Sequence, residues 1–157
     1  MRFPDTLAIV ARDRYTGLPA RGVAIVLELF AEQKNNYTVG PLISNGRGEV
    51  EFTRAECEFA IKRTQEMFIM DYQGDLESCR PVIEVSLHPP DYIRGMRQQY
   101  ETSPDFWGRA FRDPNRLFAE LEKVRNADYE LARITATEAQ ILGDQPQLEL
   151  PLVKRAA

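Results

Sequence analysis

Residues 22–31, GVAIVLELFA, form the pattern that most limits how this chain can fold. Successive side chains of a β-strand point to opposite faces, so alternate residues share one face. One face would be uniformly apolar, with Val23, Ile25, Leu27 and Leu29. The other face would be mixed, with Ala24, Val26, Glu28 and Phe30. Because a mixed second face is typical of a strand covered in part on both sides, we expect this strand in the middle of a sheet.

Strand patterns recur on both sides of this segment. Residues 45–48, Asn-Gly-Arg-Gly, predict a tight hairpin, because Asn and Gly adopt positive φ at low cost. Gly40-Pro41 indicates an edge or a bulge, and Pro151 indicates an edge strand, because proline cannot donate to a sheet ladder. The expected strands are 6–13, 22–31, 37–44, 49–53, 82–87 and 147–153, with a turn at 34–37.

Helix signals begin after residue 53. Thr53 and Glu56 fit a capping box, in which each side chain binds the backbone of the other residue. Apolar residues at helical spacing follow, so we expect a helix over about 54–66. Residues 67–72, MFIMDY, either finish this helix or form a further strand.

The last third of the chain predicts helices. Ser103-Pro104 and Asp113-Pro114 each combine a capping side chain with proline at the first helical position. Apolar residues then keep a helical spacing after Arg116, namely Leu117, Leu121, Val124, Leu131 and Ile134. Residues 135–138 fit a second capping box, where this helix would break and restart.

The loop at residues 13–22 carries a resemblance to a known family. Gly17 and Gly22 allow positive φ and Pro19 fixes its own φ, which suits a rigid crossing between the two sheets of a sandwich. The stretch VARDRYTGLPARGVAIVLEL resembles the start of transthyretin-like domains, a superfamily that includes carboxypeptidase regulatory-like domains and 5-hydroxyisourate hydrolases. The likeness continues to about residue 88, and it implies an antiparallel β-sandwich.

The same resemblance argues against the catalysis of its hydrolase branch, which uses a His on the first strand, further His and Arg residues, and a C-terminal Tyr-Arg-Gly-Ser. Residues 6–13 contain no His, and the only His in the chain is His88. Residues 92–95, Tyr-Ile-Arg-Gly, match the last motif only with one residue inserted, and no Ser follows. We therefore expect no catalytic residues, and a divergent hydrolase remains the alternative.

The charge of the chain argues against two classes of binding partner. A net charge of −4 and a pI near 5.2 disfavour general nucleic-acid binding and docking on an anionic membrane. The apolar run Leu7–Ala11 is too short for a secretory signal or a membrane span, so we expect a cytoplasmic location.

Metal and cofactor motifs are missing from the sequence. Cys57 and Cys79 have no zinc-site spacing and are expected as reduced, half-buried thiols. Residues 71–77 hold acidic side chains near a Gly but lack the spacing of a calcium loop. Neither a dinucleotide nor a phosphate-loop motif occurs, so we expect no metal and no cofactor.

Two clusters remain as candidate binding sites. The first lies in HPPDYIRG and consists of His88, Asp91, Tyr92 and Arg94. A His can serve near pH 7 as an acid, a base or a ligand. The second is aromatic and consists of Phe106, Trp107, Phe111 and Phe118. These rings either form a stacking surface or a peptide groove, or they hold the helices against the sandwich.

The patterns predict a mainly β fold with added helices. We expect a transthyretin-like antiparallel β-sandwich over residues 1–101, with the helix at about 54–66 inserted, and a helical extension over 102–157 that ends in an edge strand at 147–153. The expected function is a non-catalytic interaction or structural module that binds another protein or a second copy of itself, as in a homodimer. The alternative is a small-molecule-binding protein or divergent hydrolase that uses the His88–Arg94 segment.

Overall fold

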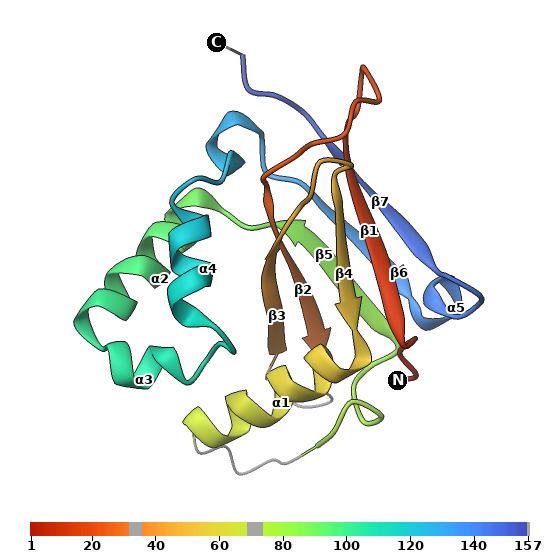
Figure 1. Ribbon diagram of the computed structural model, residues 1–157. Coiled ribbons are helices and arrows are strands. Elements are labelled where there is room, and N and C mark those ends of the chain that lie inside the picture. Colours follow the sequence, from red (N-terminus) through yellow and green to blue (C-terminus); the bar gives the residue numbers. More distant parts are fainter. Residues whose placement is uncertain (32–35, 69–73, 157) are drawn as a thin grey trace.

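The computed structural model describes residues 1–31, 36–68 and 74–156, and there the alternating segments form two β-sheets (Figure 1). The first sheet has the order β4-β1-β7, with β1 at Thr6–Asp13, β4 at Glu49–Thr53 and β7 at Gln147–Leu152. The second has the order β3-β2-β5-β6, with β2 at Ala24–Phe30, β3 at Asn36–Ile43, β5 at Val82–Leu87 and β6 at Arg133–Thr137. Of the paired strands described, β1 and β7 run parallel and the others antiparallel. The predicted β-rich, mostly antiparallel fold with added helices is confirmed.

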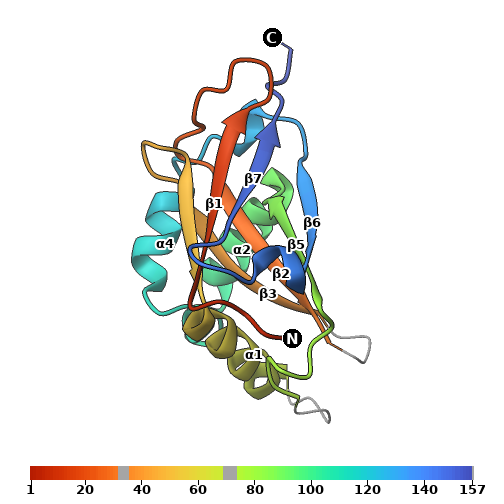
Figure 2. The same ribbon diagram turned by 90° about the vertical axis from the view of Figure 1, so that its right-hand side faces the viewer.

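The main hydrophobic core lies between the two sheets, which Figure 2 shows as two layers. Ile25, Leu27 and Leu29, predicted to share a face of β2, are fully buried in it. The facing sheet contributes Leu7, Ile9, Phe52, Leu150 and Leu152. β2 pairs with both β3 and β5, so its predicted central position is confirmed.

The loop between β1 and β2 crosses from one sheet to the other, as its sequence predicts. Asp13 organises it, because its Oδ1 accepts hydrogen bonds from the backbone N–H groups of Tyr15 and Thr16, both at 2.9 Å. These bonds, with Thr16 the larger cause, hold the pKa of Asp13 below its usual value. Gly17 and Gly22 adopt φ values of +73° and +72°.

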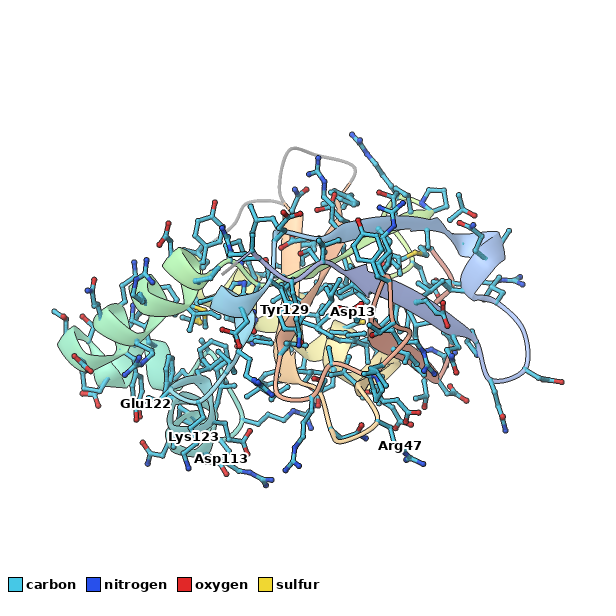
Figure 3. The ribbon with its side chains drawn as sticks, turned by 90° about the horizontal axis from the view of Figure 1, so that it is seen from above. Asp13, Arg47, Asp113, Glu122, Lys123 and Tyr129 are labelled. Carbon is cyan, nitrogen blue, oxygen red and sulfur yellow. The ribbon has the colours of Figure 1, made fainter. Side chains whose placement is uncertain are left out.

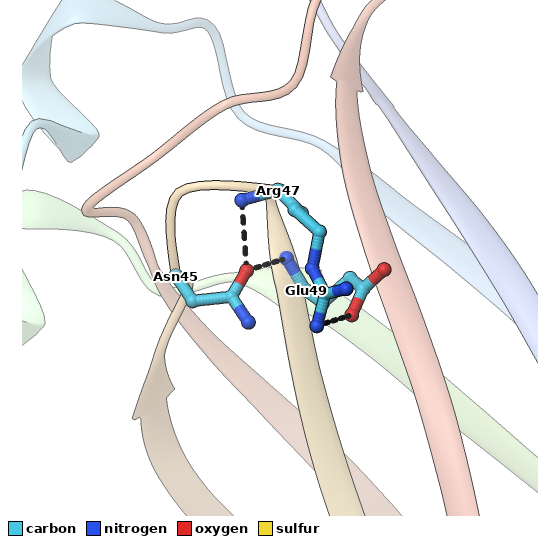
Figure 4. Close-up of polar contacts among 3 residues, drawn as sticks. All are labelled: Asn45, Arg47 and Glu49. Atoms are coloured by element: carbon cyan, nitrogen blue, oxygen red, sulfur yellow. Dashed lines mark hydrogen bonds and ion pairs between the residues drawn. The ribbon is translucent and has the colours of Figure 1, made fainter.

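Residues 45–48 form the predicted tight turn between β3 and β4 (Figure 4), but the expected hairpin is wrong, because β3 pairs with β2 and β4 pairs with β1 in the other sheet. The Oδ1 atom of Asn45 accepts hydrogen bonds from the backbone N–H groups of Arg47 at 2.9 Å and Glu49 at 3.0 Å. An exposed ion pair of 3.5 Å between Arg47 and Glu49 adds little. Gly48 closes the turn with φ +74°.

Replacement of Gly48 by Ala is expected to destabilise the protein by at least about 2 kcal/mol. The added Cβ would lie 2.4 Å from the carbonyl oxygen of Ala11, at a backbone conformation that L-residues rarely adopt. Gly46→Ala is the matched control, because a Cβ there meets nothing within 4 Å. Urea denaturation of both variants measures the difference. Equal stability would show that the close approach to β1 does not hold the turn.

The two helix starts predicted from a capping residue followed by proline are confirmed. α3 begins at Pro104 (Pro104–Gly108) and α4 at Pro114 (Pro114–Leu121). In α4, Asp113 Oδ1 accepts from the N–H of Arg116 at 3.4 Å. α1 spans Arg54–Phe68, and Thr53 caps it by accepting from the N–H of Glu56 at 3.1 Å.

The long helix predicted after Arg116 is wrong beyond Leu121, where α4 ends. A short 3-10 turn, Asn126–Asp128, follows, and residues 133–137 form β6 against β5. Leu131 and Ile134 fit a helical spacing, but Arg133–Thr137 also alternates and carries β-branched residues, so pairing with β5 decides the outcome. The second helix start also differs, because Gln140 Oε1 accepts from Thr137 N at 2.7 Å and α5 spans Glu138–Ile141.

A helical layer lies beside the sandwich and includes a helix that the sequence analysis missed, α2 at Pro90–Thr102. α2 and α4 form a second, smaller core over Ala24 at the start of β2, with Ile93, Phe118 and Leu121. Figure 3 shows this layer projecting to one side, with Asp113, Glu122 and Lys123 on it and Arg47 on the sandwich. The groove described below lies where this layer meets α1 and β3.

Residues 102–157 contain β6, which was not expected, at the edge of one sheet, and β7 at the edge of the other, where an edge strand at 147–153 was predicted. Among the described residues, none of the helices combines the length and apolarity needed to cross a membrane. Three expectations fall in part outside the described residues: the turn at 34–37, the end of the segment 67–72, and the start of the acidic loop 71–77.

Candidate functional site

A groove between β3, α1, α2 and α3 brings together residues from both candidate clusters. We call it the α1–α2 groove, and its volume is about 480 Å³. His88, Asp91 and Tyr92 line it from the first cluster, and Trp107 and Phe111 line it from the second. This volume lies within the range of small-molecule sites, roughly 300–1,000 Å³.

Local sequence places these side chains. Pro89-Pro90 ends β5 and starts α2, because proline suits the first helical position. Tyr92 and Met96 are four residues apart, so they share the face of α2 that borders the groove. Gly40 and Pro41 of β3 lie at the predicted bulge, where the register between β3 and β2 shifts between Ile25 and Leu27. Both residues also line the groove.

His88 is the most constrained residue of the groove. Only 7% of it is exposed, and its backbone is held by the carbonyl oxygen of Ala24 and by the side-chain amide of Asn126. The imidazole Nε2 lies 3.1 Å from the sulfur of Met96, and the ring meets that of Tyr92 edge-on at 6.2 Å. The buried Nδ1 has no hydrogen-bond partner among the described residues. A buried polar atom of this kind is rare and requires an explanation.

Protonation of His88 is expected to oppose folding. Burial lowers the pKa of His88 from 6.5 to about 4, because it disfavours the charged imidazolium. The unfolded chain therefore binds this proton more readily, and stability falls as the pH drops from about 6.5 towards 4. The loss at pH 5 is about 2 kcal/mol.

Two measurements check this expectation. Because His88 is the only His, its imidazole signals can be followed by NMR without assignment, and they should not titrate between pH 8 and pH 5. The stability difference between the wild type and His88→Gln should also change between pH 7.5 and pH 5. A midpoint near 6.5 in the folded protein would contradict the prediction.

Arg63, on α1, supplies a cation to the opposite wall of the groove. It is half-buried, and its guanidinium lies 5.5 Å and 5.6 Å from the ring centres of Phe59 and Phe111. It donates hydrogen bonds to the carbonyl oxygens of Ala110 and, at 3.4 Å, of Thr38. Burial lowers the pKa of Arg63, against the smaller opposite effect of Glu56. The groove therefore holds a desolvated positive charge.

The other candidate residues lie elsewhere. Arg94 forms an ion pair with Asp91, and its side chain is exposed rather than part of the groove wall. Phe106 packs edge-on against Trp107 at 5.3 Å. Phe118 is buried in the smaller core and stacks on Tyr100 at 4.3 Å, so it offers no exposed surface. The aromatic cluster thus divides between the groove and the packing of the helices.

A second depression of about 840 Å³ lies on the sheet β3-β2-β5-β6 and shares His88 and Tyr92 with the groove. Glu28 and Glu84 stand directly opposite each other there. Burial, with a smaller effect of Glu84, raises the pKa of Glu28, although Thr38 Oγ1 donates to it at 2.5 Å. Two carboxylates alone do not define a reaction, and this depression remains secondary.

The widest depression, about 1050 Å³, lies near the N-terminus. Exposed charged side chains such as Arg2, Asp5 and Asp144 form much of its wall. Such side chains stay hydrated, so they add little to the binding of an organic ligand. We therefore place the candidate site in the smaller α1–α2 groove.

The two thiols offer no nucleophile. Cys57 and Cys79 are free and more deeply buried than the sequence suggested. Burial, and then the neighbouring Cys79, raises the pKa of Cys57 to about 12, and burial raises that of Cys79 as well. Since the thiolate is the reactive form, both are inert. Within residues 1–31, 36–68 and 74–156, no group of three or more His, Cys, Asp or Glu side chains could hold a metal ion.

No family model matches the chain, and no curated protein is similar enough to count as a relative. The fold and the groove therefore define a class, a mostly antiparallel β-sheet protein with a helix-walled groove. Sequence reasoning missed Arg63 and Met96 in this groove. Arg63 sits among ordinary surface-type residues of α1, and only the folded chain brings Phe111 to it.

Proposed function

We propose that this protein is a non-catalytic binding protein whose α1–α2 groove takes a small, largely apolar organic molecule. The main observation behind this proposal is the groove itself. It has a volume of about 480 Å³ and is lined by residues that include His88, Tyr92, Trp107 and Phe111. Pockets of this kind bind mainly through apolar and aromatic walls, with a few polar groups that orient the ligand.

His88 supports a binding role. It is neutral at pH 7, and its Nδ1 is buried without a partner among the described residues. Leaving such a group unpaired costs about 1–3 kcal/mol. A rearrangement of Tyr92 or Met96 around a ligand would let the imidazole form a hydrogen bond.

The arrangement gives little support to catalysis. A general acid or base works best with a pKa near the working pH, and that of His88 lies well below it. His88 also has no carboxylate among its described hydrogen-bond partners to orient it, and Cys57 and Cys79 are inert. The divergent-hydrolase alternative is therefore the weaker one.

The proposal is tested with 1-octanol as an apolar probe. Trp107 is the only Trp in the chain, so its fluorescence reports on the groove directly. We expect saturable binding in the wild type and loss of binding in Gly95→Leu. Gly95 lines the groove and a Cβ there meets nothing within 4 Å, so we expect the leucine side chain to extend into the groove and displace the ligand.

Gln98→Leu is the control, because Gln98 lies on the same helix, is exposed and does not line the groove. It should bind octanol like the wild type. Unsaturable binding, or equal binding by Gly95→Leu, would refute the groove as the binding site.

We also infer a transthyretin-like origin for the sandwich. Its support is the loop at residues 13–22, which has the family's residue pattern and joins strands in different sheets. A protein partner or a homodimer, expected from the sequence, stays a prediction that the solution mass of the full chain would test.

A further inference from the structure

The charges of the α1–α2 groove are unequal, and this inequality points to a class of ligand. Among the described residues, two charged side chains line it, Arg63 on α1 and Asp91 on α2. Asp91 is exposed and already paired with Arg94. Among the described residues, no carboxylate lies within the 4.0 Å ion-pair distance of Arg63. Glu56, whose charge raises the pKa of Arg63, pairs instead with Arg112 at 3.6 Å.

The surroundings of Arg63 leave its charge only partly compensated. The rings of Phe59 and Phe111 and two backbone carbonyl oxygens contact the guanidinium, and all of these are neutral groups. A guanidinium has five N–H donors, and two of its nitrogen atoms donate to these carbonyls. Donors therefore remain for a further acceptor, and a planar anion with two oxygens fits such a fork best.

We propose that the α1–α2 groove selects organic carboxylates, with the ligand's carboxylate on Arg63 and its apolar body along Met96, Trp107 and Phe111. This inference rests on the proposed binding function and deepens it by naming the chemical class of the ligand. The carboxylate would neutralise a half-buried cation, and the apolar body would cover the ring faces and the thioether opposite. Asp91, at the exposed rim and paired with Arg94, does not oppose the anion.

The test compares three probes with the same eight-carbon chain and different head groups: octanoate, 1-octanol and octylamine. Binding to the full chain at pH 7 is followed by Trp107 fluorescence and by calorimetry. We expect octanoate to bind at least about tenfold more tightly than octanol, because a hydrogen bond to a charged group exceeds a neutral one by this order. Octylamine should bind most weakly.

Two variants of Arg63 separate charge from structure. Arg63→Gln keeps a hydrogen-bonding side chain and should bind octanoate and octanol equally, whereas Arg63→Lys should keep part of the preference. Lys62→Gln is the control, because Lys62 is the neighbouring cation on α1 but is exposed and does not line the groove. The ratio of the two affinities is the readout, so a general loss of stability in a variant does not imitate the result.

The outcomes divide cleanly. A preference for octanoate that disappears in Arg63→Gln and persists in Lys62→Gln supports the inference. Equal binding of octanoate and octanol by the wild type overturns the inference but leaves the proposed binding function in place. A preference for octanoate that survives in Arg63→Gln has the same two consequences. Absence of binding by all three probes overturns both.

Discussion

A chain that ends at residue 101 is expected to stay unfolded, although the sequence alone places a domain boundary there. Such a chain lacks β6, which pairs with β5, and β7, which pairs with β1. It also lacks buried residues of the main core, namely Tyr129, Ala136, Ile141, Leu150 and Leu152. Two sheets with unpaired edges and part of the core missing cannot offset the conformational entropy lost on folding.

Far-ultraviolet circular dichroism, urea denaturation and amide NMR dispersion measure this. The matched control removes only residues 156–157 and keeps β7 and the bridge between Tyr129 and Lys154, so it should unfold cooperatively like the full chain. A cooperative, well-dispersed chain of residues 1–101 would restore the domain boundary and make the C-terminal third a true appendage.

Replacement of Asn126 by Ala is expected to remove about 3 kcal/mol of stability. Asn126 is 1% exposed and joins the start of β2 to the end of β5. Its Oδ1 accepts from the N–H of Ala24 at 2.8 Å. Its Nδ2 donates to the carbonyl oxygens of Ala24 at 3.0 Å and His88 at 2.7 Å. Alanine would leave buried backbone groups without these partners.

Urea denaturation of three variants isolates the cause. Asn126→Asp keeps the acceptor but loses the donor, and its charge would face two carbonyl oxygens, so we expect it to be at least as unstable as Asn126→Ala. Asn115→Ala is the control, because Asn115 is exposed and accepts one hydrogen bond, from Tyr100 Oη at 2.6 Å. A loss below about 1 kcal/mol in Asn126→Ala would mean that water or a shifted backbone replaces the amide.

Much of the fold could be predicted because its signals are local. Alternation marked β1, β2, β4 and β5, and proline behind a capping residue marked α3 and α4. α2 was missed although Pro90 and Asp91 form a good helix start, because Gly95 and the many polar residues that follow weaken the apolar period. β6 was mistaken for helix because Leu131 and Ile134 fit a helical spacing, while Arg133–Thr137 also alternates, and only the pairing with β5 decides between the two.

Some residues of the candidate site could be predicted from the sequence, but their assembly into one groove could not. His88 and Trp107 stood out in the sequence by chemical type, yet α2 and α3 must fold back across α1 before both can line one groove. Arg63 and Asn126 gave no local signal, since an Arg in a helix and an Asn in a loop are usually solvated. Their roles depend on Phe111 and His88, which are distant in sequence.

The parallel pairing of β1 with β7 has a consequence for how fast this protein reaches its native state. Residues 8–13 find their partners at 147–152, so nearly the whole chain serves as the connection between two neighbouring strands. Contacts of such high sequence separation close slowly, since the loop entropy is lost before the pairing is gained. During synthesis β1 emerges before β7, and the backbone N–H and C=O groups on one side of β1 stay unpaired until β7 is made. Chaperone dependence and aggregation during refolding should therefore be governed by this one late contact.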